Sequence, residues 1–346
     1  MSESVFSTDH DSIRVAIVGA SGYTAVEAAR WIARHPAATV SVATSRSEIG
    51  KRFDAVHRSL LGQTDVVLSK LDPAVIAEHA DVAFCCLPHG ASAETVRQLV
   101  DAGLRVVDFS ADFRLSDLAT YQSWYGVTHP WPERFGKVVY GMPEFFREQI
   151  AGADIVANPG CYPTSAILPL APLIGEDLIE PTDIIIDAKS GVSGAGRSAK
   201  LGTLFCETNE SIAAYAVGTH RHGPEIDDLV TRISGVPCEA IFTPHLTPMI
   251  RGILSTIYVR PKLRSIDDAK SLLRETYRDF PMIRIVDHLP ATAEVSGSNA
   301  VHITIASSRD RWVIVSVIDN LAKGASGAAV QNMNVMFGLA PDLGLS

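Results

Sequence analysis

The sequence has a deficit of positive charge and no long hydrophobic run. Its 346 residues include 30 Lys and Arg against 39 Asp and Glu, which gives a formal net charge of -9. Binding to a nucleic-acid backbone or to an anionic membrane surface requires clustered basic residues, so neither nucleic acid nor membrane is expected as a partner. No apolar stretch reaches the roughly 18 residues that a membrane-spanning helix needs. A small-molecule substrate is the expected partner.

Cysteine is scarce, and its spacing excludes several kinds of site. The five cysteines form neither a CxxC pair nor a zinc-binding pattern, so reduced thiols and no metal are expected. Residues 1–12 are polar and acidic and lack the basic stretch and apolar run of a secretory signal. The expected location is the cytoplasm. Four cysteines are expected to pack in or near the core: Cys85, Cys86, Cys206 and Cys238.

The chain is longer than one hydrophobic core usually allows, which predicts two domains. Apolar runs at 13–18, 39–43, 81–86 and 104–109 alternate with helical patterns, one of them at 91–102. Strands that alternate with helices predict an α/β fold with a doubly wound parallel sheet of the Rossmann type.

The second half of the chain has a different pattern. Apolar runs crowd together at 184–188, 240–242, 253–259, 301–306 and 312–318. They predict a mixed α/β unit whose strands are mainly antiparallel. A last helical pattern covers about 325–337, and the pattern alone does not say on which half it packs.

A glycine turn follows the first predicted strand and leads into the first predicted helix. It includes Gly19, Ser21, Gly22, Tyr23 and Thr24. Glycine at this place lets the backbone approach a pyrophosphate, and the helix N-terminus favours negative charge. The turn predicts a dinucleotide site, with a glycine turn that binds nothing as the alternative.

The end of the second predicted strand indicates which dinucleotide is bound. NAD enzymes usually place Asp or Glu there, whereas this chain has Thr44, Ser45 and Arg46, which can donate to a 2′-phosphate. NADP is therefore favoured. Against this, Glu48 could reach the ribose or neutralise Arg46, and Arg46 could be a solvated surface charge.

The candidate nucleophile is Cys161, in the segment NPGCYPTSAIL. Pro163 is typical of the first turn of a helix, so Cys161 is expected at the helix entrance. The N–H groups there and the helix dipole are expected to lower the pKa of its thiol and to hold an oxyanion. An inert buried cysteine is the alternative.

Two histidines, His220 and His222, flank Arg221 in the segment GTHRHGPEI, where Pro224 and Glu225 indicate a helix start. Either imidazole could serve as a general acid or base beside a cationic group. A zinc site would need further ligands that the sequence does not supply. Ordinary surface histidines are the alternative.

Residues 190–197 read SGVSGAGR and follow a predicted strand directly. Such a loop offers backbone N–H groups and hydroxyls to a phosphate. Ser193 and Arg197 are the candidates for holding the phosphate of a substrate, and a flexible surface turn is the alternative.

Together these segments resemble the N-acetyl-γ-glutamyl-phosphate reductases of arginine biosynthesis over nearly the whole chain. The motifs that carry the resemblance are GASGYT at 19–24, CLPHG at 86–90, VDFSADFR at 107–114, YGMPE at 140–144, NPGCYPT at 158–164, SGVSGAGR at 190–197, HRHGPEI at 220–226, PHLTPMIRGI at 244–253 and IDNLAKGASGAAVQNMN at 318–334.

The resemblance implies that NADPH reduces an acyl phosphate through a cysteine thioester, with Cys161 as the nucleophile and His220 or His222 as the acid or base. It also implies a Rossmann domain (1–157), a catalytic and dimerisation domain (158–322) and a C-terminal helix (323–346) that returns to the first domain, in a homodimer or homotetramer. The residues expected at the cofactor are Gly19, Ser21, Gly22, Tyr23, Thr24, Ser45, Arg46, Pro88, Ser190, Gly191 and Asn320. Those expected at the substrate are Asn158, Ser193, Arg197, Arg114 and Glu225.

The sequence departs from the family pattern in one place near the cofactor, where Ala25 replaces the usual glycine. Three rival functions remain open at this level. They are reduction of a related acyl phosphate, such as aspartyl or carrier-bound aminoadipyl phosphate, a non-catalytic NADP sensor on the same fold, and the same chemistry run toward aldehyde oxidation.

Overall fold

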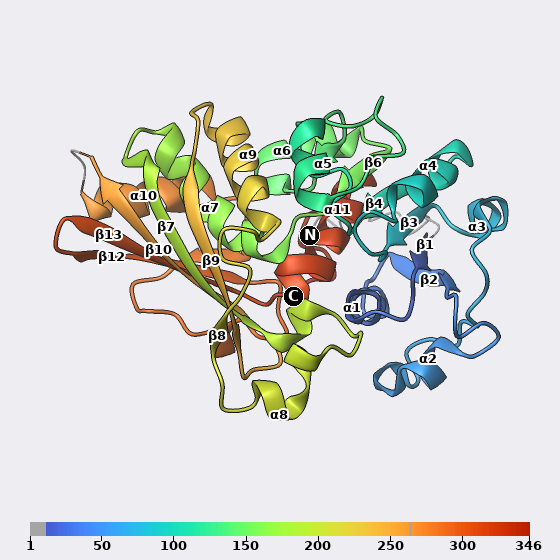
Figure 1. Cartoon of the computed structure of the whole chain (residues 1–346). Helices are drawn as coiled ribbons and strands as arrows, with labels where there is room; N and C mark the ends of the chain where they lie inside the picture. Colours follow the sequence, from blue (N-terminus) through green and yellow to red (C-terminus); the bar gives the residue numbers. More distant parts are fainter. Residues whose placement is uncertain (1–11, 263–264) are drawn as a thin grey trace, which may run out of the picture.

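The computed structural model describes residues 12–262 and 265–346. Two β-sheets lie side by side, and the C-terminal helix lies between them (Figure 1). The expectation about a signal segment concerns residues that, apart from Ser12, lie outside the described part. Among the described residues, no helix combines the length and apolar character needed to cross a bilayer.

The first sheet has six strands in the order β2-β1-β3-β4-β6-β5, and all neighbouring strands are parallel. The predicted doubly wound parallel sheet is therefore confirmed. β5 and β6 are too short to leave a periodic signal in the sequence, which is why they were not predicted. The strands are β1 (Ile13–Val18), β2 (Ala38–Thr44), β3 (Val82–Cys85), β4 (Arg105–Asp108), β5 (Val139–Tyr140) and β6 (Ile155–Ala157).

Helices connect these strands. Several begin at side-chain caps: Asp72 caps one, and Asp112 accepts hydrogen bonds from Gly90, Ser92 and Ala93 at the start of another. The helices are α1 (Tyr23–Ile32), α2 (Phe53–Val56), α3 (Pro73–His79), α4 (Ala93–Asp101), α5 (Leu118–Tyr125) and α6 (Pro143–Ala151).

The strand order of this sheet creates a crevice beside β1. β1 pairs with β2 on one side and with β3 on the other, so successive strands are added in opposite directions from this point. Ligands of doubly wound sheets bind at such a switch point, beyond the carboxyl ends of the strands. Gly19 follows β1 and Cys86 follows β3, so both lie at this edge.

The second sheet has seven strands in the order β11-β12-β13-β10-β7-β9-β8. Four of its pairs are antiparallel, and the pairs β7–β9 and β11–β12 are parallel. The prediction of mainly antiparallel strands is confirmed. The strands are β7 (Ile179–Gly191), β8 (Ala213–Ala214), β9 (Ala240–Thr247), β10 (Ile253–Pro261), β11 (Ile283–Ile285), β12 (Val301–Ser308) and β13 (Arg311–Ile318).

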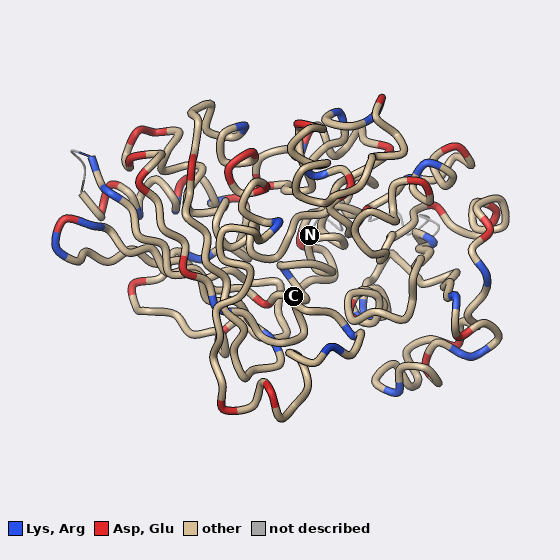
Figure 2. Tube along the Cα trace, in the orientation of Figure 1, with Lys and Arg blue, Asp and Glu red and all other residues tan. Residues whose placement is uncertain are grey.

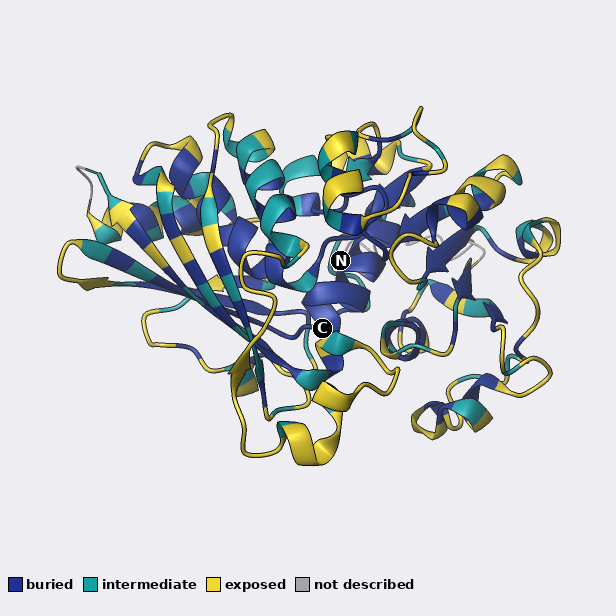
Figure 3. Ribbon diagram, in the orientation of Figure 1, coloured by how far each residue is buried: buried dark blue, intermediate teal, exposed yellow. Residues whose placement is uncertain are grey.

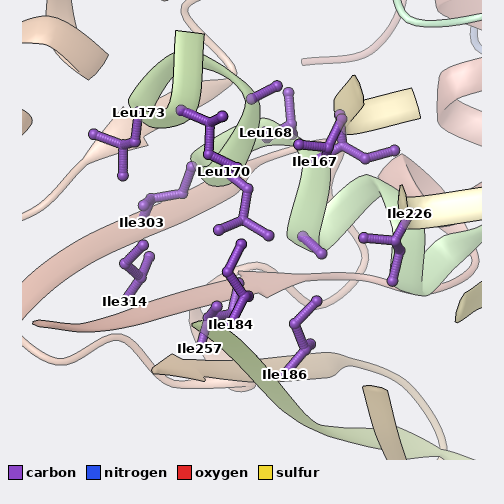
Figure 4. Packing of buried hydrophobic residues seen from close by; sticks show 14 of the residues in the cluster. Ile167, Leu168, Leu170, Leu173, Ile184, Ile186, Ile226, Ile257, Ile303 and Ile314 are labelled. Atoms are coloured by element: carbon purple, nitrogen blue, oxygen red, sulfur yellow. The ribbon is translucent and has the colours of Figure 1, made fainter. Parts of the chain in front are cut away.

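One face of this sheet is covered by α7 (Cys161–Gly175), α9 (His222–Ser234) and α10 (Ile266–Thr276) (Figure 1). Figure 4 shows leucines of α7 over isoleucines of the strands, for example Leu170 over Ile184 and Ile257. Burying each such side chain stabilises the fold by roughly 1.5–3 kcal/mol. This packing holds the first residue of α7, Cys161, in a fixed relation to the sheet.

The opposite face of the same sheet carries an exposed apolar row. Ile185 pairs with Ile241 of β9 and with Tyr258 of β10, so the three side chains form one row. Their exposed fractions are 38%, 65% and 37% in that order. Buried and exposed residues alternate along these strands in Figure 3, as expected for a sheet with one covered face.

The chain returns to the first sheet after β13. A π-helix (Ala322–Ser326) precedes α11 (Gly327–Met336), and every residue of both is buried. The sequence predicted one helix from about 325 and gave no sign of the π-helix. α11 packs against α1 and α6, and the Ser326 hydroxyl donates to the backbone oxygen of Thr24 at 2.8 Å.

One prediction about cysteine is wrong. Cys85 and Cys238 are buried and Cys86 is partly buried, but Cys206 is exposed. It lies in α8 (Phe205–Thr208), a short helix whose described residues are mostly on the surface. In Figure 3 this helix is mostly yellow, the colour of exposed residues.

Candidate active site

Cys161 is the first residue of α7, and Gly160 is the N-cap. The predicted helix entrance is therefore present, with the turn Asn158–Gly160 leading to it from β6. Cys161 keeps partial exposure, yet the protein around its thiol removes enough solvent to raise the pKa to about 11, while the Tyr162 N–H and the charge of Arg114 act in the opposite direction.

The sequence-based expectation that the pKa of Cys161 is lowered is therefore not met. The helix terminus and Arg114 favour the thiolate, but the loss of solvation outweighs them. The resting form of Cys161 is the thiol, and its proton has to leave when the sulfur acts as a nucleophile.

Glu225 organises the turn before the cysteine. This buried carboxylate accepts from the Tyr140 hydroxyl at 2.7 Å and from the Gly160 N–H at 2.9 Å. It also pairs with the guanidinium of Arg114 at 3.2 Å, and Arg114 donates to the backbone oxygen of Phe109. Glu225 and Arg114 were expected at the substrate, and here their charges neutralise each other beside Gly160.

Both histidines lie at the start of α9, which begins at His222. A Cβ atom on Gly160 would lie 2.8 Å from Nε2 of His222 and 2.9 Å from Arg114, so only glycine fits. The same His222 Nε2 is 4.0 Å from Glu225. Burial, with the charges of neighbouring groups, lowers the pKa of His222 well below its usual value.

One hydrogen bond fixes the tautomer of the neutral His220 ring. Its Nδ1 accepts a hydrogen bond from the backbone N–H of His222 at 3.1 Å, which leaves the proton of the neutral ring on Nε2. Burial lowers its pKa to about 4, helped by the charge of Arg221, so the ring is neutral near pH 7. Rings of Tyr162, Tyr215 and Phe242 pack around it.

The glycine turn after β1 is built as the sequence suggested. Gly19 has φ +87°, and a Cβ there would lie 2.7 Å from the backbone oxygen of Cys86. The N-cap of α1 is Gly22, which has no side chain to occupy the first N–H groups. His57 holds the carbonyl oxygen of Ala20 at 2.9 Å, and Arg197 donates to that of Ser21 at 3.0 Å.

This arrangement fits a dinucleotide. The carbonyl oxygens of the turn are engaged by side chains, and the uncapped helix terminus, with its N–H groups, remains for a pyrophosphate. Ala25, the departure from the family pattern, is fully buried in α1, so the packing role of the usual glycine is met by a small side chain.

At the end of β2 the candidates for the ribose differ in environment. Ser45 is buried, and its hydroxyl accepts from the Glu48 N–H at 3.2 Å. Arg46 is exposed. Glu48 forms an ion pair with Lys51 at 2.6 Å. The ion-pair partner of Glu48 is therefore Lys51 and not Arg46.

The SGVSGAGR segment ends β7 and forms a short 3-10 turn. Ser193 accepts from the side-chain amide of Asn320 at 2.9 Å, and the amide oxygen of Asn320 accepts from the Gly252 N–H. Gly191 lies so close to Arg251 and its neighbour that a Cβ would be 2.8 Å from their backbone. These residues join β7, β10 and β13.

Two other expected site residues have different surroundings. Asn158 is buried, donates to the backbone oxygen of Ala325 at 2.9 Å and accepts from Asn332 at 3.1 Å. Pro88 is exposed in the loop after β3.

Within residues 12–262 and 265–346, no three His, Cys, Asp or Glu side chains gather closely enough to hold a metal ion.

A cavity of about 850 Å³ runs along α1 between the two halves of the molecule. Its lining includes Tyr23, His57, Ser193 and Arg197, but neither Cys161 nor the two histidines. It therefore adjoins the nucleotide turn and not the candidate nucleophile.

Sequence reasoning missed Gly324, which touches the nucleophile. A Cβ on this π-helix residue would lie 2.8 Å from Cβ of Cys161. Next to it, Lys323 is 2% exposed and pairs with Glu144 of α6 while donating to Gln331. Gly324 lies one residue before the last predicted helical pattern, so that pattern gave no signal for it.

A parallel nucleotide-type sheet, a mixed sheet and a cysteine at a helix entrance between them define the class of semialdehyde dehydrogenases. Residues 14–153 match the family model for the semialdehyde dehydrogenase NAD binding domain, and residues 161–320 match that for the dimerisation domain. Aspartate semialdehyde dehydrogenase II of Vibrio cholerae has the same fold, with a TM-score of 0.72 at 17% identity, covering 95% of this chain and 99% of that one.

Curated relatives narrow the class. N-acetyl-gamma-glutamyl-phosphate reductase of Rhodopirellula baltica is 67% identical over 340 residues, covering 96% of this chain and 98% of the relative. That of Desulforudis audaxviator is 47% identical over 338 residues, with the same coverage of both chains. The chain belongs to the N-acetyl-γ-glutamyl-phosphate reductase family.

Proposed function

We propose that this protein uses NADPH to reduce N-acetyl-γ-glutamyl phosphate to N-acetylglutamate 5-semialdehyde and phosphate. The observation that carries the proposal is Cys161 at the entrance of α7, with Gly160 fixed by Glu225. His222 lies against Gly160, and the His220 ring packs on Tyr162. The close relationship to the reductases of this name supports the choice of substrate.

The cofactor NADP(H) would be held by the glycine turn and by the end of β2. Gly19, Ser21, Gly22, Tyr23 and Thr24 surround the uncapped start of α1. Ser45 and Arg46 lie where the ribose is expected, and Pro88 follows the neighbouring strand. When bound, the cofactor supplies the hydride that reduces the Cys161 thioester.

The reaction at Cys161 balances without an external base. The sulfur attacks the acyl carbon, the C–S bond forms, and the bond between that carbon and the phosphate oxygen breaks. The thiol proton leaves with the phosphate as hydrogen phosphate. The step therefore starts from the thiol, which is the form that the raised pKa of Cys161 favours. After reduction, the oxyanion collapses to the aldehyde, the C–S bond breaks, and the released thiolate takes a proton from solvent.

Of the two histidines, His220 is proposed to act on the substrate oxygen. Its Nδ1 is occupied by the His222 N–H, so its Nε2 is a hydrogen-bond donor. A neutral donor can stabilise the oxyanion of the tetrahedral intermediate without giving up its proton. His222, wedged against Gly160, is proposed to position the turn that carries Cys161.

Asn158, Arg114 and Glu225 are proposed to position the substrate through the turn before Cys161, since their side chains are buried and bonded to protein groups. Ser190, Gly191, Ser193 and Asn320 would fix the shape of the SGVSGAGR loop. We likewise propose that the chain divides after residues 157 and 322, into the Rossmann domain, the catalytic and dimerisation domain, and the C-terminal helix.

The chain is also proposed to form a homodimer through the open face of the second sheet. Ile185, Ile241 and Tyr258 form an exposed apolar row, and a second copy of this face would cover it. The match to a dimerisation domain supports this placement.

The deciding experiment runs the reaction backward. Purified protein receives N-acetylglutamate semialdehyde, inorganic phosphate and NADP+, and NADPH formation is followed. A phosphate-dependent rate is expected with this aldehyde and not with aspartate semialdehyde, and Cys161→Ala is expected to abolish it while NADPH binding survives. More than a tenth of the wild-type rate in Cys161→Ala would contradict the thioester route.

A further inference from the structure

Arg197 reaches from the second half of the molecule to the cofactor turn of the first. It ends the SGVSGAGR segment, and its NH1 donates to the backbone oxygen of Ser21 at 3.0 Å. Within residues 12–262 and 265–346, no other hydrogen bond or ion pair of Arg197 is found. A guanidinium has five N–H groups, so most of its donors are available beside the turn.

The charge of Arg197 acts on the region that follows β2. The pKa of Glu48 is lowered mainly by Lys51, and Arg197 adds to the lowering. Burial lowers the pKa of His57, and Arg197 again adds to it. Because Glu48 pairs with Lys51 at 2.6 Å, Arg197 lies near an acidic group without being its ion-pair partner.

The same region is where a Rossmann fold places the ribose of the adenosine. The ribose lies at the end of the second strand, here at Ser45 and Arg46, and the pyrophosphate lies at the start of α1. A cation between Ser21 and Glu48 therefore faces the ribose side of the site. Basic and acidic residues are scattered over both halves in Figure 2, so binding of a phosphate here is expected to depend on individual side chains.

We propose that Arg197 binds the 2′-phosphate of NADP(H), opposite Arg46, and that the choice of NADP over NAD is completed by the catalytic half of the molecule. The proposal rests on the cofactor named under the proposed function. It moves Arg197 from the substrate phosphate, where the sequence placed it, to the cofactor. Arginine suits this role because its planar fork can bond to a phosphate while retaining the Ser21 contact.

This assignment links cofactor recognition to the SGVSGAGR segment of the second half of the molecule. Arg197 and Ser193 belong to one segment, and Ser193 is held by Asn320 at the end of β13. A phosphate that engages Arg197 would therefore fix this segment against the cofactor turn. NAD(H), which lacks the 2′-phosphate, would leave the Arg197 side chain bonded to Ser21 alone.

The test measures binding and not turnover. Dissociation constants of NADPH and NADH are determined by cofactor fluorescence, and those of 2′,5′-ADP and 5′-AMP by calorimetry. The proteins are wild type, Arg197→Ala, Arg197→Lys and Arg46→Ala. Lys200→Ala is the matched control, because it removes an exposed cation from the same loop.

Arg197→Ala is expected to weaken NADPH and 2′,5′-ADP by roughly 10- to 100-fold, the usual effect of losing charge-assisted hydrogen bonds. NADH and 5′-AMP are expected to change by less than about threefold, since they make no contact with a 2′-phosphate site. Arg197→Lys is expected to fall between, and Lys200→Ala to match wild type.

An unchanged ratio of NADPH to NADH affinity in Arg197→Ala would overturn the inference. Equal weakening of both cofactors would do the same, since it would place Arg197 at the pyrophosphate or at the turn itself. If wild type bound neither cofactor, the proposed function would fail as well, so the two failures are distinguishable.

Discussion

At the scale of single residues, the candidate site rests on how Cys161 and His220 are held. The sequence placed Cys161, the candidate nucleophile, at a helix entrance, and this position is confirmed, because proline and glycine mark that entrance in the local pattern. It misjudged the pKa of the thiol, because solvation depends on atoms from distant segments, such as Gly324 of the π-helix. The choice between the histidines required one hydrogen bond that no spacing reveals.

The raised pKa of Cys161 predicts slow alkylation of the free protein near neutral pH. With a pKa of about 11, the thiolate is the minor form, and the rate with iodoacetamide is expected to rise about tenfold per pH unit between pH 7 and 10. Mass spectrometry of Cys161 in a Cys206→Ser background measures this rate and avoids the exposed thiol. A rate that levels off below pH 8 would show that the helix terminus dominates.

Replacing His220 is expected to separate hydrogen-bond donation from proton transfer. His220→Ala should lower kcat by about 10²- to 10³-fold, as loss of an oxyanion donor does. His220→Gln keeps an N–H at the position of Nε2 and should recover at least tenfold of that loss. Equal loss in both variants would instead indicate that His220 transfers a proton.

The pKa of about 4 adds a second readout for the same histidine. Because burial depresses the pKa of His220, its ring is neutral above pH 5. The pH profile of kcat near pH 6.5 should therefore be the same in wild type and in His220→Gln. His222→Asn serves as the comparison for a positioning role.

At the scale of elements, long regular segments were predictable and short or irregular ones were not. β1 and β10 agree closely with the apolar runs in the sequence. β5 and β8 have two residues each and are formed by pairing with partners far along the chain. The π-helix has no periodicity of its own, and it depends on close packing against α7.

The π-helix gives a prediction for an element that touches no substrate. In Gly324→Ala the added methyl group would overlap with Cβ of Cys161 at 2.8 Å. Displacing a nucleophile by a fraction of an ångström is expected to lower kcat by about 10- to 100-fold. NADPH affinity should stay within about threefold of wild type, because the added methyl group meets Cys161 and the backbone oxygen of Asp319 and not the cofactor turn.

Gly152→Ala is the matched control for this variant, since a Cβ there meets nothing within 4 Å. Loss of activity together with loss of NADPH binding in Gly324→Ala would point to general unfolding and away from a displaced cysteine.

At the scale of the whole molecule, the open face of the second sheet predicts the assembly. Ile241→Asp puts a charge at the most exposed residue of the apolar row formed with Ile185 and Tyr258. Analytical ultracentrifugation should then show monomers at concentrations where wild type is a dimer. Val75→Asp, at an exposed position on α3, is the control. A dimer that survives Ile241→Asp would place the interface elsewhere.

The burial of α11 has a consequence for biogenesis. The cover of the first sheet comes from residues more than 300 positions away, as the contact between Ser326 and Thr24 shows. During synthesis the ribosome exposes β1 and α1 long before α11 exists, so the N-terminal sheet emerges with an apolar surface that nothing yet occupies. We expect this nascent intermediate to be open to aggregation and to chaperone capture.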